Sequence, residues 1–114
     1  MKISLKGYGE NAATFRTSGL VCQGEPVTMA ENFTVKPCEE EDSIIGCVLN
    51  SKDGYASVQL AGYVQFALTG GLIPTVGVCG FVADGNGGVC VSSEGRQFVV
   101  TDVDTVNNKV GFIL

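Results

Sequence analysis

One stretch of the sequence combines residue types that bind metal ions or phosphates in other proteins. Residues 82–90 read VADGNGGVC and place three glycines, an Asp and an Asn between two short apolar runs. Calcium loops need oxygen ligands at positions 1, 3, 5, 7 and 12, with a Gly at position 6 for a sharp turn. Phosphate sites use glycine-rich loops that open a helix. A third interpretation is purely structural, namely the turn of a β-hairpin.

The residues in and around this stretch fit neither a calcium loop nor a phosphate site. If Asp84 takes position 3 of a calcium loop, Asn86 and Gly87 take positions 5 and 6 as the motif requires. Val82 and Ser93 then occupy positions 1 and 12, where the motif needs carboxylates. Neither GxGxxG nor GxxxxGK[ST] is present, and no helix is expected to follow. We therefore predict a tight hairpin turn that joins GFVA to GVCV.

The cysteines are the other possible metal ligands or nucleophiles. Their number is odd, none lies in a CxxC pair, and the sequence has no His to complete a zinc site. Four of them stand among apolar neighbours, in LVCQ, IIGCVL, VGVCGF and GGVCVS. We predict buried, reduced thiols that pack as small hydrophobic side chains. The five are Cys22, Cys38, Cys47, Cys79 and Cys90.

No arrangement of residues typical of catalysis is evident. Without His, a Ser or Cys nucleophile lacks its usual base, and an apolar environment disfavours a thiolate. The four adjacent acidic side chains at residues 39–42 repel one another, and such a run is typical of a solvated surface loop. Asp102 and Asp104 share one face of a strand at ~7 Å spacing, which a polar outer face explains without chemistry. We expect no catalytic residues, no cofactor-binding residues, no metal ligands, and a protein that is not an enzyme.

Composition and charge limit the possible partners. The chain has 114 residues, 45% of them hydrophobic, which predicts one compact domain. Its net charge of −5, with basic residues scattered singly, argues against nucleic acid and against an anionic membrane surface. No window approaches the ~20 apolar residues of a membrane helix. The first apolar run is too short for a signal peptide, so we expect synthesis and retention in a cytoplasm.

Alternation of apolar and polar residues predicts strands. Residues 57–68, SVQLAGYVQFAL, read as one half-buried strand with a bend at Gly62. The Asp-Gly pair of SKDGY predicts a hairpin between SIIGCVLN and this strand, and DTVNN predicts a second one between RQFVVTDV and KVGFIL. Apart from a possible helical turn at EEEDSII, no helix is expected. The predicted fold class is therefore all-β, a single compact antiparallel β-barrel or sandwich.

The first seventeen residues do not follow this pattern. They are rich in Gly, Asn, Ala and Thr, with isolated apolar side chains. We predict an N-terminal arm at residues 1–17 and a β-barrel or sandwich domain at residues 18–114. The alternative is that residues 1–17 form a first strand of the barrel, followed by a loop.

The order of several segments resembles a known family. The segments are GLVCQGEPVTM, FTVKPCEEEDSIIGCVLN, DGYASVQLAGYVQFALTG, VGVCGFVADGNGGVCV and VNNKVGFIL. This order resembles the small head-decoration, or capsid cement, proteins of tailed bacteriophages and prophages, and the related short phage proteins of unassigned function. The resemblance covers roughly residues 18–114, and each of its elements is short and built from ordinary β-turn chemistry.

The resemblance implies a structural function without catalysis and without a cofactor. It implies a protein made in the bacterial host cytoplasm that binds the major capsid protein on the outside of the virion, as a homotrimer, and stabilises the head. The arm would supply contacts by strand addition. The contact residues expected in the arm are Lys2, Ile3, Leu5, Lys6 and Phe15. Two alternatives remain: another phage assembly part, such as a tail, connector or fibre-linked β module, and a small ligand-binding β-barrel.

Overall fold

The computed structural model describes residues 9–114, and this part of the chain folds into strands and turns without a helix. The predicted all-β fold class is therefore confirmed. Five strands belong to the first half: β1 (Asn11–Thr17), β2 (Pro26–Glu31), β3 (Thr34–Pro37), β4 (Gly46–Lys52) and β5 (Tyr55–Ala61). Five belong to the second half: β6 (Tyr63–Thr69), β7 (Gly77–Ala83), β8 (Val89–Val91), β9 (Arg96–Asp104) and β10 (Lys109–Ile113).

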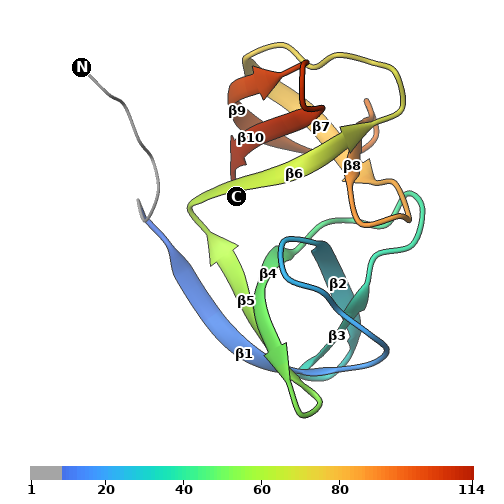
Figure 1. The fold of residues 1–114 in the computed structure, drawn as a ribbon, viewed down its shortest axis with the longest axis vertical. Coiled ribbons are helices and arrows are strands. Elements are labelled where there is room, and N and C mark those ends of the chain that lie inside the picture. The colour runs from blue at the N-terminus through green and yellow to red at the C-terminus, as the bar shows by residue number, and fades with distance from the viewer. Residues whose placement is uncertain (1–8) are drawn as a thin grey trace.

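The strands form two barrels rather than one. Strands β1 to β5 close an N-terminal barrel in the order β1-β3-β2-β4-β5, and β6 to β10 close a C-terminal barrel in the order β10-β6-β8-β7-β9. In Figure 1 the blue-to-green barrel lies below the yellow-to-red one. Each barrel also contains a parallel pair, β1 with β3 and β6 with β8. The predicted β-barrel architecture is therefore confirmed, and the structure adds that the strands close into two barrels in which most, but not all, pairs are antiparallel.

The two barrels repeat one topology. In each, the first strand pairs antiparallel with the fifth and parallel with the third, while the second strand pairs antiparallel with the third and fourth. The sequence repeats weakly where the first strand ends, as TSGL at residues 17–20 and TGGL at residues 69–72. The chain is thus a tandem duplication of one five-stranded arrangement.

Gly62 marks the passage from one barrel to the other. The predicted long strand is divided there into β5 and β6, and Gly62 has a φ of 92°, which only glycine adopts freely. Figure 1 shows the chain turning sharply between the two strands. The buried Gln59 side chain donates from Nε2 to the carbonyl oxygens of Ala61 at 2.9 Å and Tyr63 at 3.0 Å. These hydrogen bonds on both sides of Gly62 stabilise the bend.

The two barrels have chemically different cores. The core of the N-terminal barrel is aliphatic and consists of Val21, Val27, Val35, Val48, Ala56 and Val58. In the C-terminal barrel, Phe112 is completely buried, and its ring centroid lies 5.6 Å from that of Phe66, 5.0 Å from Phe81 and 4.5 Å from Phe98. Phe112 is therefore the centre of an aromatic cluster that fills this barrel.

Residues of the N-terminal barrel complete that aromatic core. Cys38, Ile44 and Cys47 pack in the same buried cluster as the phenylalanines of the C-terminal barrel. Backbone hydrogen bonds fix this contact, because Glu41 N donates to Ala83 O at 2.9 Å and Ala83 N to Asp42 O at 3.1 Å. The segment between β3 and β4 thus joins the two barrels into one packed body.

The predicted hairpins are confirmed. Asp53 and Gly54 have φ values of 55° and 81° and connect β4 to β5, as expected for an Asp-Gly turn with two positive φ angles. Asn108, with a φ of 52°, ends the turn between β9 and β10. The VADGNGGVC stretch connects the antiparallel strands β7 and β8. Gly, Asp and Asn thus stand at the left-handed positions of these three turns.

All five cysteines are free, but only some follow the predicted burial. Cys38 and Cys47 are buried, Cys79 and Cys90 are half-buried, and Cys22 is exposed. The prediction was wrong for Cys22 because residues 20–25 form a connection at the surface rather than a strand. Burial raises the pKa of the Cys38 thiol to about 12 and that of the Cys47 thiol to about 11.

The predicted arm is partly a strand of the body. Residues 11–17 form β1, which pairs with β5 from Asn11 to Arg16. The division at residue 17 was therefore wrong, and the alternative of a first barrel strand holds for this segment. Residues 1–8 lie outside the described part of the chain.

Truncation of the central aromatic residue tests the importance of this core. We expect Phe112→Ala to lower the free energy of unfolding by about 3 to 5 kcal/mol, because it removes ring contacts and leaves a cavity. Denaturant titration followed by circular dichroism measures the change. Phe33→Ala is the matched control, since Phe33 is 78% exposed, and it should change stability by less than ~0.5 kcal/mol. Equal effects of the two substitutions would contradict the assignment.

Candidate interaction surface

The structure places only one of the predicted arm contacts. Phe15 lies in β1 and packs against the aliphatic core of the N-terminal barrel. Phe15 therefore belongs to a barrel strand rather than to a free arm, and its role in capsid contact stays a prediction. Lys2, Ile3, Leu5 and Lys6 lie outside the described residues.

The VADGNGGVC turn uses its own carboxylate internally. Asp84 accepts hydrogen bonds from the backbone N–H groups of Asn86 at 2.7 Å and Gly88 at 2.9 Å, and from the Thr69 hydroxyl at 2.8 Å. Partial burial raises the pKa of Asp84, but these hydrogen bonds outweigh it and hold the pKa below its ordinary value. The carboxylate therefore fixes the hairpin, which explains the residue without a bound ion.

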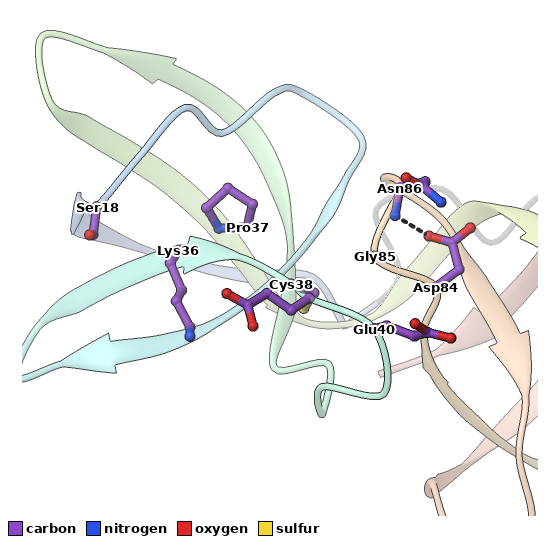
Figure 2. Close-up of a pocket in the computed structure, with 9 residues that line it drawn as sticks. Ser18, Lys36, Pro37, Cys38, Glu40, Asp84, Gly85 and Asn86 are labelled. Carbon is purple, nitrogen blue, oxygen red and sulfur yellow. Dashed lines mark hydrogen bonds between the residues drawn. The ribbon is translucent and has the colours of Figure 1, made fainter.

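A groove lies between the barrels beside this turn. It has a volume of about 520 Å³. Figure 2 shows Lys36 and Cys38 on one side of it and Asp84 and Asn86 on the other. The groove is lined by Ser18, Lys36, Pro37, Cys38, Glu39, Glu40, Asp84, Gly85 and Asn86.

The groove lacks the features of a reactive site. The Cys38 thiol is buried, and its pKa of about 12 keeps it protonated at neutral pH. Within residues 9–114, no group of three or more His, Cys, Asp or Glu side chains is placed to hold a metal ion. The groove thus lies at the junction of the two barrels.

The acidic run forms part of that junction. Glu39, Glu40 and Glu41 are exposed, as predicted for a solvated loop. Asp42 is half-buried, and its carboxylate accepts from Glu39 N at 2.9 Å, which stabilises a local turn. Glu40 also forms an isolated β-bridge with Asp84. The sequence indicated an exposed loop, but its backbone contact with the other barrel had no signal in the residue types.

A row of aliphatic side chains crosses the outside of the C-terminal barrel. Val78 on β7 is paired with Val99 on β9, and Val99 is paired with Ile113 on β10. Val78 and Val99 are 64% and 50% exposed, and Ile113 is half-buried. Cross-strand partners lie on the same face of a sheet, so these three residues form a continuous row on adjacent strands. We call this row the apolar stripe.

The connection that leads into β7 carries further exposed apolar side chains. Leu72, Ile73 and Val76 are between 62% and 69% exposed, and Val76 precedes Val78 by two residues. We use the term apolar face for the stripe together with these three side chains. Sequence reasoning missed this face, although the run Phe98-Val99-Val100 contained the signal. Alternation on one strand must turn the middle residue outward when its neighbours are buried.

The polar border of the apolar stripe is held by a tyrosine and an aspartate. Tyr63, the β6 partner of Ile113, donates from its hydroxyl to the Asp102 carboxylate at 2.9 Å. The tyrosine reaches across Gly111, where any Cβ atom would collide with both side chains. Burial, together with this hydrogen bond, raises the pKa of Tyr63 to about 12. Three adjacent strands are thus tied together on their outer side.

Asp102 and Asp104 serve separate local roles. Asp102 accepts from the hydroxyl groups of Tyr63 and Thr101. Asp104 accepts from the backbone N–H groups of Val106 and Asn107 and so fixes the β9–β10 turn. Each carboxylate is therefore explained by structural hydrogen bonds, as expected for a polar strand face.

The Asp84 hydrogen bonds predict an acid-dependent stability. A carboxylate whose native pKa is lowered stabilises the fold above its unfolded pKa, and this contribution disappears as the pH falls through the native value. We expect Asp84→Asn to lower the free energy of unfolding by about 1 to 2 kcal/mol at neutral pH, and the difference to shrink below about pH 3.8. Thermal unfolding at several pH values measures this. Asp53→Asn, in an exposed turn, is the control. A pH-independent difference would refute the assigned role.

The Tyr63 hydroxyl predicts the opposite dependence in alkali. Its native pKa of about 12 lies above the ordinary value of 10.0, so its stabilising contribution is complete below pH 10 and is lost as the pH rises toward 12. We expect Tyr63→Phe to be less stable than the wild type at neutral pH, with a gap that closes in this window. Denaturant titrations between pH 8 and 12 test the prediction. Tyr55→Phe, which alters a 52% exposed side chain, should show no such closing gap.

Comparison with known proteins adds no assignment. No protein-family model matches the sequence, and a search of curated proteins gave no significant match. No helix able to span a membrane occurs in the part of the chain that the structure describes. Functional inference therefore depends on the surface and on the segment order of the sequence.

Proposed function

We propose that the chain is a structural protein that decorates the outer surface of a tailed-bacteriophage capsid and stabilises the head without catalysis. Its partner is the major capsid protein, on which it sits as a homotrimer. The observation that carries the proposal is the exposed apolar face on an otherwise acidic body, since exposed apolar side chains gathered on one barrel mark a protein contact, here the contact between the copies of the homotrimer. The segment order that resembles capsid cement proteins supplies the identity of the partner.

The interior of the molecule supports a binding role on its outside. Phe112 and its neighbours fill the C-terminal barrel, and valines fill the N-terminal one. In the described residues, every buried side-chain nitrogen and oxygen atom has a hydrogen-bond partner. A barrel filled by its own side chains does not enclose a ligand, so this observation favours surface contacts over the alternative of a ligand-binding barrel.

The charge of the chain fits assembly on a repeating lattice. A net charge of −5 keeps the free protein soluble. Many weak contacts of equal kind on a symmetric shell then add up to tight attachment. An additional contact by strand addition is proposed for Lys2, Ile3, Leu5 and Lys6, which precede β1 in the sequence.

Binding to purified phage particles tests the proposal. The protein is mixed with expanded heads, and separately with tails, of the phage that encodes it, and co-sedimentation is measured. We expect saturable binding to heads, with a raised melting temperature of the heads, and no binding to tails. Binding to tails alone would replace the proposal with the alternative of a tail or connector part, and binding to neither would refute it.

A truncation tests the proposed arm contact. Removal of residues 1–8 leaves β1 and both barrels intact, so the shortened protein should unfold at the temperature of the full chain. We expect its affinity for heads to fall by about tenfold or more, equivalent to ~1.4 kcal/mol. Unchanged affinity of the folded truncation would show that these residues are not the contact. Removal of residues 1–17 is unsuitable, since it deletes β1.

A further inference from the structure

We propose that the apolar face of the C-terminal barrel is the surface through which copies of this chain bind one another. The occupant of the face is thus a second copy of the chain. The face consists of the apolar stripe and the three side chains before β7, namely Leu72, Ile73, Val76, Val78, Val99 and Ile113. The inference deepens the proposed homotrimer by naming its contact, but it concerns the free protein and can be tested without a capsid.

Charge favours a second copy as the occupant. Two copies with a net charge of −5 each repel one another over most orientations. The apolar face contains no charged side chain, and Asp102 at its border is engaged by Tyr63 and Thr101. Contact through this face therefore brings two acidic bodies together where like charges are absent. Copies arranged around a symmetry axis can bring this face together without placing like charges opposite one another.

The face is well exposed. Five of its six side chains are at least 50% exposed, and a typical protein contact buries ~800 Å² on each partner. Other exposed hydrophobic side chains lie in turns or connections. Leu20, Phe33 and Val106 are between 78% and 86% exposed; Phe33 lines a hollow with Phe15 and Met29, and Leu20 lines one with Val21 and Tyr55.

The stripe is rigid before binding. Val78, Val99 and Ile113 are β-branched residues on three adjacent, hydrogen-bonded strands, and the sheet beneath them is anchored by Phe112. β-Branched side chains have few rotamers, so little conformational entropy is lost when they are covered. Such a row is ordered before binding, so most of the free energy gained by burying its apolar area is retained. A flexible loop would lose more conformational entropy on binding.

Measurement of the oligomeric state tests the inference. Sedimentation equilibrium and native mass spectrometry are performed on the full chain over a wide concentration range. We expect one discrete oligomer, with Val78→Lys and Val99→Lys shifting it to monomer. Leu20→Lys and Val106→Lys introduce the same charge at exposed aliphatic positions outside the face and should leave the oligomer intact. Val78→Thr and Val99→Thr keep the β-branched shape, so they remain informative if a lysine variant unfolds, and should weaken association about tenfold or less.

Each outcome decides the question. A wild-type chain that stays monomeric at all concentrations, or that forms a broad series of aggregates, would overturn the inference. So would folded stripe variants that assemble as the wild type does. Head binding by a monomeric wild type would retain the proposed function and reject this contact. A discrete oligomer that is lost in the stripe variants supports the contact even if the protein fails to bind heads.

Discussion

The structure depends on the closure of one aromatic core by residues from the other barrel. Phe112 contacts three other phenylalanines, and Cys38, Ile44 and Cys47 complete the cluster from the N-terminal side. A barrel of about 50 residues buries little surface by itself, so a shared core gives each half stability that it lacks alone. The Gly62 bend and the hydrogen bonds between residues 41–42 and Ala83 follow from this packing. The two barrels consequently form a single cooperative body.

The same strand alternation that builds the core also builds the apolar face. On β9, Phe98 and Val100 point inward while Val99 points outward, and on β10 Phe112 and Ile113 divide in the same way. Stability and recognition therefore use opposite faces of the same strands. A substitution on the outer face can change association while the core remains intact, which separates the two properties experimentally.

The sequence predicted local features well and global ones poorly. Asp53-Gly54 and Asn108 mark hairpins because left-handed backbone restricts the residue types that fit there. No residue pattern indicated the number of barrels, because apolar and polar residues alternate in the same way whether a sheet closes after five strands or after ten. The sequence left β1 undecided between an arm and a barrel strand because NAATFRT is mostly small and polar, and the strand is stabilised by pairing with β5 and by partial burial of Phe15. Prediction of the apolar face would have required the pairing of valines across strands, which only the structure shows.

The two barrels share one topology, but only the C-terminal barrel carries the apolar face, and this difference affects how copies of the chain can associate. Leu20 and Leu72 follow the first strand of their barrels at corresponding positions. Leu20 lies beside Tyr55 and the turn with Lys52 and Asp53, whereas Leu72 is followed by exposed Ile73 and Val76. A chain with two equivalent adhesive ends would join into open chains, because each end would recruit a further copy. Restriction of the apolar face to one barrel instead favours a closed oligomer and leaves the other barrel free for a different partner.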